Sequence, residues 1–395
     1  MEKSIATKEK KVSNFVPNDL VYLILSKLPL KSLKRFGVVH KSWALLFKNS
    51  DFMSMYRHKL LSYDHSYYED STLLLHLNKA GNEDHPFLDF KMELYMLSGE
   101  RFQNKSLINW PNPFEDDHPG FSILGSSSIN GILCLYRYFG ENKKIVFWNP
   151  AIGKFKIIPS SPIESVSHLD ELHGFGYDLL KHDYKVIRHI TIRSHNDALV
   201  ESPGKISYDT FWEIYSLQSN SWKKLYINMP FCYGDMEGFR LYMDGVCHWL
   251  ALGIRYDDEE YLVSFNMSNE MFVTTHIPLD MDDSFNIRYA RKHLVVLNGY
   301  IAMVSNYSQM TTFNISILGE IGKKDSWTKL FVVGPMPCVE HPIGTWKNGN
   351  IFFRKENSEL VWFDISTQKI ENLGLKSQER FGKIVTYRKS HCLIE

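Results

Sequence analysis

A short pattern recurs along the chain from residue 95 onward, and it constrains the fold more than any other feature of these 395 residues. Each copy has an aromatic residue, a polar turn, and an aromatic or aliphatic residue seven positions later. A sixth copy, residues 317–327, fits if its turn is three residues longer. Successive copies start 53, 67, 50, 52 and 46 residues apart. The other five are YMLSGERF from Tyr95, WNPAIGKF from Trp148, YSLQSNSW from Tyr215, FNMSNEMF from Phe265 and FDISTQKI from Phe363.

The repeats predict an all-β domain after residue 60. Runs between the copies are short, rich in aromatic and β-branched residues, and bounded by Gly, Asn, Asp and Pro, as strands and turns are. Each copy is typical of two strands joined by a tight turn, in which Gly99, Gly153 or Asn220 can adopt positive φ. Because one hairpin is marginal in water, six at this spacing predict radial stacking, as in a six-bladed β-propeller. A two-sheet sandwich array is the alternative.

The first 60 residues have a helical period instead. Five apolar residues share one stripe of a predicted helix over 18–28, with Pro17 in its first turn and Pro29 as its stop: Leu20, Val21, Ile24, Leu25 and Leu28. A second helix is expected with Leu30, Leu33 and Phe36 inward and its end at Gly37. Further apolar residues predict a third and a fourth helix, the fourth capped near Asp51: Val39, Trp43, Leu46 and Phe47, then Phe52, Met55, Tyr56 and Leu60.

Four short helices carry too little core to be stable by themselves. We therefore expect this segment to complete its core on another protein, the alternative being the chain's own C-terminal domain. Residues 1–60 hold 12 Lys/Arg against 4 Asp/Glu, a net of +8, so the rest holds 33 against 41, a net of −8. The basic residues alternate with apolar ones, which favours an acidic protein surface over nucleic acid as partner.

The N-terminal residues resemble the F-box of plant F-box proteins over nearly the whole of that motif. The resemblance implies docking on a Skp-type adaptor, which joins a cullin-RING complex, and the adaptors are acidic. The departures from the family pattern are Phe15-Val16, Gly37, Val38 and His40. The adaptor-binding residues that the resemblance implies are Pro17, Leu20, Ile24, Leu25, Leu28, Pro29, Leu33, Phe36, Val39 and Trp43.

The β region is similar, over about residues 130–375, to the F-box-associated domain of plant F-box proteins, which is sometimes called kelch-like and includes the S-locus F-box-like group. The Gly-Gly of kelch blades and the Trp-Asp of WD40 blades are both missing. The pieces that carry the resemblance are GILCLYR, IVFWNPAIGKFKIIPSSP, HGFGYDLLKHDYKVIRH, WEIYSLQSNSWKKL and DGVCHWLA.

Motifs of catalysis and of metal or cofactor binding are not found, so we expect no cofactor and no catalytic residue. The five cysteines form no C-x-x-C pair, and the 16 histidines form no H-E-x-x-H or H-x-H pattern. His173, His182 and His248 are interpreted as packed or surface residues. The stretch GFGYDLL has two of the three glycines of a dinucleotide fingerprint and is interpreted as a turn.

The remaining use of such a domain is recognition of a client protein. Candidate binding loops are 194–207, 231–239, 255–260 and 280–288. Within them a weak candidate for an interface core with a charged rim is Phe231, Tyr233, Asp235, Met236 and Glu237, although these aromatics fit a buried role as well.

Together these features predict a disordered tail (1–13), an F-box helical domain (14–60) and a propeller (61–395). The predicted function is the non-catalytic substrate-recognition subunit of an SCF-type (Skp-cullin-F-box) ubiquitin ligase, without membrane contact, in the cytoplasm or nucleus. The rival hypothesis is a propeller enzyme or glycan-binding lectin with an accessory helical arm.

Overall fold

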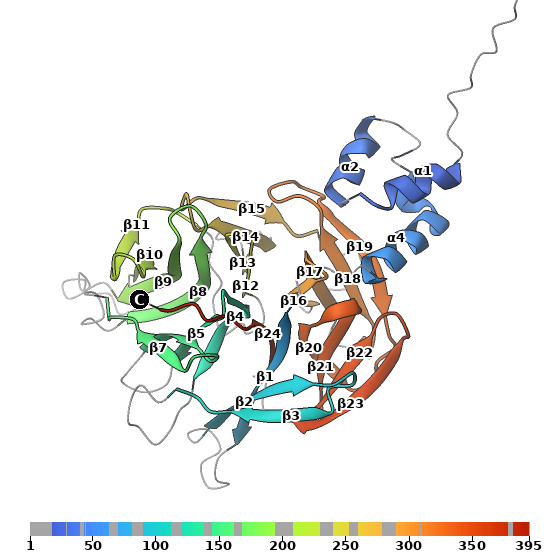
Figure 1. Ribbon diagram of the computed structural model, residues 1–395. Helices are drawn as coiled ribbons and strands as arrows, with labels where there is room; N and C mark the ends of the chain where they lie inside the picture. Colours follow the sequence, from blue (N-terminus) through green and yellow to red (C-terminus); the bar gives the residue numbers. More distant parts are fainter. Residues whose placement is uncertain are drawn as a thin grey trace, which may run out of the picture. The chain divides into compact units, whose positions relative to one another are not determined.

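The computed structural model describes residues 18–28, 30–39, 43, 45–62, 70–80, 90–111, 121–137, 144–161, 168–193, 208–229, 240–252, 260–278, 290–307, 310–377 and 382–394. The chain divides into two compact units, Met1–Ser62 and Tyr63–Glu395 (Figure 1). The predicted tail 1–13 lies outside the described residues.

The first unit is helical. It contains α1 (Asn18–Leu25), α2 (Leu30–Val39), the 3₁₀ turn η1 (Leu46–Lys48) and α4 (Ser50–Ser62). The ring of Phe52 is fully buried and lies 5.8 Å from that of Tyr22 and 6.1 Å from that of Tyr56. The other buried hydrophobic residues among those described in the unit are Leu25, Leu33, Leu46, Met53, Tyr56 and Leu60.

Three helix boundaries differ from the sequence prediction. α1 ends at Leu25 rather than Leu28, because the N–H groups of Lys27 and Leu28 bond to carbonyls three residues back and tighten the last turn. α2 continues through Gly37 to Val39. The cap of α4 is Asn49 and not Asp51, since Asn49 Oδ1 accepts the N–H of Phe52 at 2.8 Å.

The predicted third helix falls largely outside the described residues. Of that stretch the structure describes Trp43, whose ring contacts Phe36 at 5.7 Å, and η1.

The second unit is a six-bladed β-propeller, as predicted. Its described strands form one eight-stranded sheet and four four-stranded sheets around a common axis (Figure 1). The eight-stranded sheet consists of two antiparallel blades joined by one parallel bridge, between Thr386 and Ser127, so the described strands make six four-stranded blades. The bounds, from the innermost strand outward, follow. Blade 1 has β24 (Lys383–Arg388), β1 (Ser71–Ala80), β2 (Phe90–Ser98) and β3 (Asn104–Ile108). Blade 2 has β4 (Ser122–Ile129), β5 (Ile132–Arg137), β6 (Lys144–Asn149) and β7 (Lys154–Ile157). Blade 3 has β8 (His168–Asp178), β9 (Asp183–Arg193), β10 (Tyr208–Ser216) and β11 (Ser221–Leu225). Blade 4 has β12 (Arg240–Met243), β13 (Val246–Leu252), β14 (Glu260–Asn266) and β15 (Phe272–His276); blade 5 has β16 (Ala290–Leu297), β17 (Tyr300–Tyr307), β18 (Phe313–Leu318) and β19 (Trp327–Val333); blade 6 has β20 (Val339–Thr345), β21 (Asn350–Lys355), β22 (Glu359–Asp364) and β23 (Lys369–Lys376), with the 3₁₀ turn η6 (Lys347–Gly349) between its first two strands.

The two ends of the propeller sequence close the ring. The last strand, β24, pairs antiparallel with β1, so that Arg388 lies opposite Ser71. After β24 the chain continues over blade 2, where Asn149 Nδ2 donates hydrogen bonds to the carbonyls of Ser390 (3.0 Å) and Cys392 (2.9 Å). Residues more than 300 positions apart in the sequence therefore build blade 1 together.

The six predicted hairpins are the outer two strands of the six blades. In blade 3, for example, Tyr215 lies opposite Trp222, seven positions later. Two copies have a different register: Tyr95 pairs with Leu107 instead of Phe102, and Leu318 rather than Ile317 pairs with Trp327. Gly99, Gly153 and Asn220 all have positive φ, as the turns require.

The connections separate into two ends of the propeller. The turns within the inner and the outer strand pairs lie at one end, here called the turn end, and those of β4–β5, β12–β13 and β16–β17 are Asn-Gly or Asp-Gly pairs with positive φ at both residues. The connections between the second and third strands, and between successive blades, lie at the opposite end, here called the connection end. Most of the longer connections are at the connection end.

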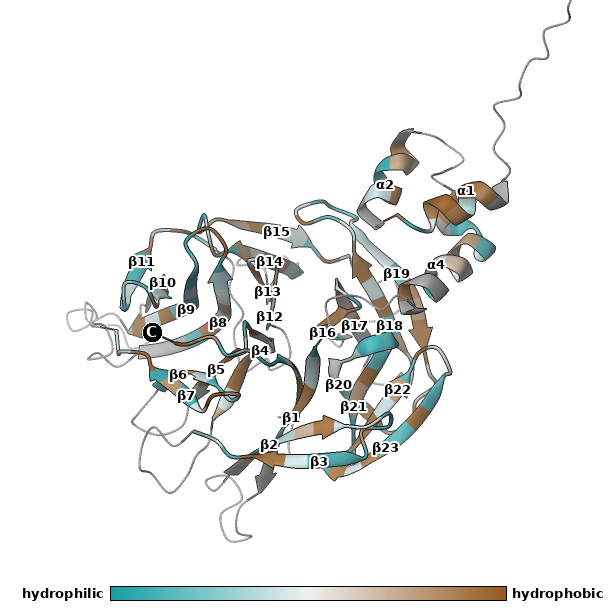
Figure 2. Ribbon diagram, in the orientation of Figure 1, coloured by the Kyte–Doolittle hydropathy of each residue, from teal (hydrophilic) through white to brown (hydrophobic). Residues whose placement is uncertain are grey.

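Hydrophobic clusters join neighbouring blades. One cluster holds Phe147 of blade 2 with Phe175 and Tyr215 of blade 3, and another holds Leu241 of blade 4 with Leu294 of blade 5. Similar clusters join blades 1 and 2, blades 3 and 4, and blades 6 and 1. Along the strands of Figure 2 the hydrophobic residues are distributed round the whole ring. Each blade thus depends on its neighbours to cover its two faces.

The stretch GFGYD is part of strand β8 and not a turn, which corrects the sequence interpretation. Its two glycines allow β8 to approach blade 4 closely. A Cβ on Gly174 would lie 2.7 Å from Cys247 Sγ, and one on Gly176 would lie 2.6 Å from Met267 Cγ. A register shift between Leu172 and Gly174 places His173 beside the same blade, 5.3 Å from the Trp249 ring.

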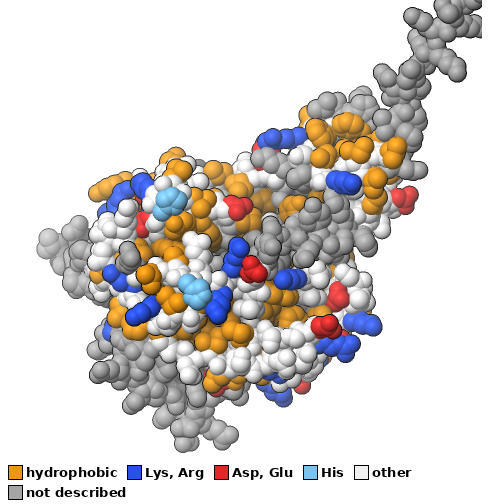
Figure 3. All heavy atoms as spheres, viewed as in Figure 1, with side chains coloured by type: hydrophobic (Ala, Val, Ile, Leu, Met, Phe, Trp, Pro, Cys, Tyr) orange, Lys and Arg blue, Asp and Glu red, His pale blue; other side chains and the backbone are white. Residues whose placement is uncertain are grey.

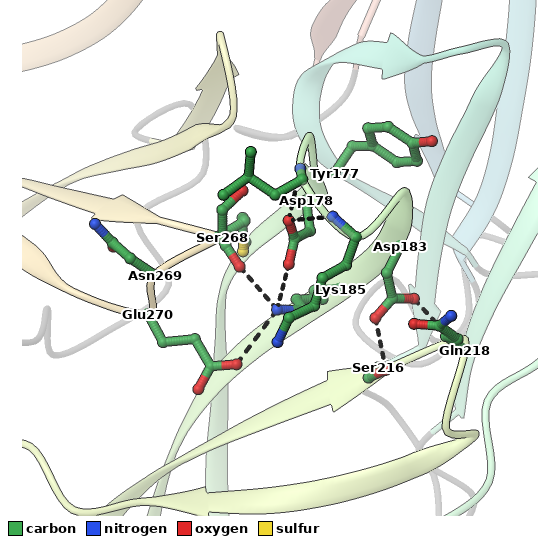
Figure 4. Close-up of polar contacts among 12 residues, drawn as sticks. Tyr177, Asp178, Asp183, Lys185, Ser216, Gln218, Ser268, Asn269 and Glu270 are labelled. Carbon is green, nitrogen blue, oxygen red and sulfur yellow. Dashed lines mark hydrogen bonds and ion pairs between the residues drawn. The ribbon is translucent and has the colours of Figure 1, made fainter.

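A buried ionic cluster links blades 3 and 4 at the turn end (Figure 4). Lys185 Nζ donates hydrogen bonds to Asp178 Oδ2 (2.9 Å), to the carbonyl of Met267 (2.8 Å) and to Glu270 Oε1 (3.3 Å). Burial by itself would raise the pKa of Asp178. Hydrogen bonds from Lys185, Ser268 and the N–H groups of the following turn outweigh that effect, so the pKa lies well below its usual range.

We predict that Lys185→Met lowers the free energy of unfolding by about 3–5 kcal/mol, because it leaves the Asp178 carboxylate buried without its cation. Urea denaturation followed by tryptophan fluorescence measures the change. The matched control is Lys181→Met in the adjacent exposed turn, which should cost less than about 0.5 kcal/mol. Equal urea midpoints for the two variants would contradict the prediction.

We also predict that Gly174→Ala destabilises the propeller by about 1–3 kcal/mol, since the added methyl group overlaps Cys247. The control is Gly382→Ala, where the nearest atom to a Cβ is Ser377 Oγ at 3.3 Å. Thermal unfolding compares the two variants. A melting temperature that stays at the wild-type value for Gly174→Ala would show that blade 4 can move away at no cost.

Candidate protein-binding surfaces

Helices α1 and α2 expose large hydrophobic side chains. We call this set the helical apolar surface; its members are Leu20, Leu23, Ile24, Phe36 and Val38, with exposed fractions from 38% to 88%. Leu20, Leu23 and Ile24 share one face of α1 by their spacing. Figure 2 shows α1 as mostly hydrophobic, and in Figure 3 hydrophobic side chains gather on the helical unit. Exposed apolar groups gathered in this way are typical of a protein-binding surface.

Basic side chains accompany this surface. Lys27, Arg35 and Lys48 are exposed, against one exposed acidic residue, Asp51, among the helical residues whose side chains the structure describes. An apolar surface with basic neighbours fits an acidic partner by charge matching.

The structure places the predicted adaptor-binding residues in three settings. Leu20, Ile24 and Phe36 are exposed, and Leu28 and Trp43 are half-buried. Leu25 and Leu33 are buried within the helical unit, so they are not part of the exposed surface, and their role in adaptor binding stays a prediction. Pro17, Pro29 and the side chain of Val39 lie outside what the structure describes.

Sequence reasoning missed Leu23 and Val38. The signal for Leu23 was its i+3 spacing from Leu20 on the stripe. Val38 gives no such signal, because the sequence predicts the end of α2 at Gly37.

The predicted client-binding residues, Phe231, Tyr233, Asp235, Met236 and Glu237, lie outside the described residues. The strands on either side nevertheless show where the candidate loops belong. Segments 194–207, 231–239, 255–260 and 280–288 connect β9 to β10, β11 to β12, β13 to β14 and β15 to β16. All four connections belong to the connection end of the propeller.

Five of the nine propeller histidines whose burial the structure describes are packed inside it, His173 and His248 among them. His248 is buried and its Nδ1 lies 2.9 Å from Ser264 Oγ; His182 is in the β8–β9 turn, 3.3 Å from the Tyr177 hydroxyl. Neither ring nitrogen of the buried His173 has a hydrogen-bond partner.

Among the residues that the structure describes, no group of three or more His, Cys, Asp or Glu could hold a metal ion. No described helix is long and apolar enough to cross a membrane.

Burial keeps the buried histidines of the propeller neutral. It lowers the pKa of His189 to about 4 and that of His248 to about 3. For His76, with a pKa of about 4, and His293, with a pKa of about 3, nearby cations add to the effect of burial. The pKa of His173 is also well below its usual value, again mainly through burial.

We predict that the propeller loses stability as the pH falls below about 6.5. An unfolded chain binds protons at its histidines near pH 6.5, whereas His76, His189, His248 and His293 bind theirs only near pH 3–4. Each histidine then costs about 1.4 kcal/mol per pH unit below 6.5, or about 5 kcal/mol per unit for the four. Urea unfolding at pH 7.5 and 5.5 measures the loss, and His248→Gln should reduce it by about a quarter. Identical stabilities at the two pH values would refute it.

The family comparisons agree with both units. Residues 87–392 match the family model described as the F-box associated beta propeller domain, and residues 16–55 match that of the F-box domain. The F-box protein CPR1 of Arabidopsis thaliana is 23% identical, with 91% of this chain and 84% of that protein covered. The F-box protein At3g07870 of the same plant is 26% identical, with 88% and 79% covered. The F-box/kelch-repeat protein At3g23880, also from Arabidopsis thaliana, is 24% identical, with 91% and 90% covered. The propeller model alone spans more than half of the chain, so the chain belongs to the family of plant F-box proteins with an F-box associated β-propeller.

Proposed function

We propose that this protein is the substrate-recognition subunit of an SCF-type ubiquitin ligase, which binds a Skp-type adaptor through its helices and a client protein through its propeller. The adaptor would connect it to a cullin-RING complex in the cytoplasm, the nucleus or both. The observation that carries the proposal is the helical apolar surface of an F-box unit, exposed on α1 and α2.

The size of the helical unit explains why such a surface stays exposed. A unit of about 60 residues has too little volume to bury all its hydrophobic residues. Burying one leucine or isoleucine side chain contributes about 1.5–3 kcal/mol, so a partner that covers Leu20, Leu23 and Ile24 gains substantial binding free energy. The neighbouring Lys27, Arg35 and Lys48 would favour an acidic adaptor.

The client would bind at the connection end of the propeller. A ring of blades is a rigid scaffold, and long connections on such a scaffold suit recognition of a particular protein. The four candidate loops belong to that end. The propeller begins at Ser71, which pairs with Arg388 at the turn end. The chain therefore enters the propeller at the end opposite to the connection end.

The protein would contribute to ubiquitin transfer by proximity and not by a chemical step. Holding a client close to a charged conjugating enzyme raises the effective concentration of its lysines. Membership of the F-box family supports a non-catalytic role.

We predict that Ile24→Asp weakens binding to a purified Skp-type adaptor by about 2 kcal/mol or more, roughly 30-fold, because it puts a charge into the apolar contact. Ile24 is 57% exposed, so the variant should keep its fold. The control is Leu180→Asp on the β8–β9 turn, where the side chain is 79% exposed, and it should bind the adaptor as the wild type does. Isothermal titration gives the affinities, and circular dichroism checks the fold. Undiminished binding by Ile24→Asp would remove the proposal's main support.

A further inference from the structure

The β8–β9 turn exposes two adjacent leucines at the turn end of blade 3. Leu179 is 52% exposed and Leu180 is 79% exposed. Surface turns are usually built from Gly, Asn, Asp, Ser or Pro, and the turns β4–β5, β12–β13 and β16–β17 of this propeller are Asn-Gly or Asp-Gly pairs. The fold of a blade therefore does not need leucines at this position.

The turn that carries these leucines is firmly held. Asp178 Oδ1 accepts the N–H groups of Leu180 and Lys181, each at 3.0 Å. The other oxygen of the same carboxylate, Oδ2, accepts a hydrogen bond from the buried Lys185 at 2.9 Å (Figure 4). Because the turn is ordered before a partner arrives, a partner that covers Leu180 loses little free energy in ordering it.

The end of the chain lies beside this turn and adds a third exposed leucine. After β24 the chain crosses to blade 3, where its end is marked in Figure 1, and Ile394 packs in the hydrophobic cluster that includes Tyr177. Burial, followed by the nearby Cys392, raises the pKa of Tyr177. Leu393 lies between Cys392 and Ile394 and is 61% exposed. We call the following set the turn-end surface: Leu179, Leu180, Lys181, Arg388, Lys389 and Leu393.

The exposed cations of the turn-end surface come from separate parts of the chain. Lys181 belongs to blade 3, whereas Arg388 ends β24 and Lys389 follows it. Lys154, at the start of β7, adds a fourth exposed cation at the same end of blade 2. Among the described residues of blades 2 and 3 and of segment 382–394, no exposed acidic residue lies at the turn end. Charge matching therefore favours an acidic partner.

Two exposed acidic residues border the turn-end surface on its other sides. Asp70 is just before β1, and Asp244 precedes Gly245, where an added Cβ would lie 3.0 Å from Leu179 Cδ1. A uniformly negative partner, such as a nucleic acid or an anionic membrane, would be repelled by both carboxylates. A protein segment can place its own carboxylates against the cations alone, so the surface fits a protein better.

We infer that the turn-end surface binds an acidic protein segment, whose apolar side chains cover Leu180 and Leu393 and whose carboxylates pair with Lys181 and Lys389. Exposed apolar groups gathered on a rigid turn and surrounded by charge are typical of such an interface. The candidate client loops belong to the opposite end of the propeller, so a partner bound here leaves them free. This second site goes beyond the proposed function and does not require it.

The test selects peptides of about 12 residues from a random display library on the full-length protein. Selected peptides should carry a net negative charge together with large apolar residues. Their affinity for Leu180→Ser should be about tenfold lower than for the wild type, because an apolar contact is lost. Their affinity for Lys389→Gln should be about threefold lower, with a weaker dependence on salt, because one exposed cation is missing.

Leu393→Ser, close to the end of the chain, tests the same surface without changing the β8–β9 turn, and it should weaken binding severalfold. Two controls are matched in exposure: Tyr226→Ser, where the side chain is 90% exposed, and Lys329→Gln, an exposed lysine of β19. Both controls should bind the selected peptides as the wild type does. All these side chains are exposed, so thermal unfolding should give the wild-type melting temperature for each variant.

Selected peptides that are neutral or basic, or that bind Leu180→Ser and Leu393→Ser as they bind the wild type, would overturn the inference. Binding of heparin or of phosphatidylserine vesicles that is tighter than peptide binding and lost in Leu180→Ser would overturn it in favour of a nucleic acid or a membrane. Self-association in analytical ultracentrifugation that is lost in Leu180→Ser would assign the surface to a second copy of the chain instead. Adaptor affinity, measured separately with Ile24→Asp, decides the ligase proposal, so the two can fail independently.

Discussion

The contact between neighbouring blades is the interaction on which the rest of the propeller depends. A four-stranded sheet has two faces, and each must be covered by another element before the sheet is stable in water. Here the clusters that cover those faces each draw residues from two adjacent blades. The pairing of β24 with β1 turns the row of blades into a ring, so no blade keeps an uncovered outer face at the ends of the row. The glycines of β8 follow from this stacking, because they let β8 pack closely against blade 4.

The need to cover hydrophobic faces also explains why the two units differ in how they bury their hydrophobic residues. The propeller buries its core between blades, although single hydrophobic residues such as Leu180 and Tyr226 stay exposed on it. The helical unit buries Phe52, Leu33 and their neighbours, but the face of α1 that carries Leu20 and Ile24 remains open to solvent. A surface of this kind is costly for a protein that stays alone and favourable for one that binds a partner. The difference between the units supports a division of roles, in which the helices attach and the propeller recognises.

Charge inside the propeller is arranged by the low dielectric of the interior. Between blades 3 and 4, Lys185 is matched by Asp178 and Glu270, so the cluster joins two blades without an unpaired buried charge. His76, His248 and His293 are also buried, and their lowered pKa values keep them uncharged. On the axis, Arg240 is likewise paired with Glu171 Oε1, at 2.8 Å.

The sequence by itself determined the class of each unit. The spacing of aromatic residues around tight turns predicted six hairpins, because a hairpin is a local structure whose turn and flanking residues lie together in the chain. The apolar stripe with Pro17 and Pro29, together with the family resemblance, predicted the F-box in the same way. Only the tertiary structure decided which apolar residues of the helices are exposed: it buried Leu25 and Leu33 and left Leu23 and Val38 in solvent. The tertiary structure also decided that GFGYD is part of a strand. Gly174 in this strand packs against Cys247, which lies 73 positions further along the chain. The turn-end surface could not be predicted, because Leu180 and Leu393 are far apart in the sequence and come to the same surface only when the ring closes.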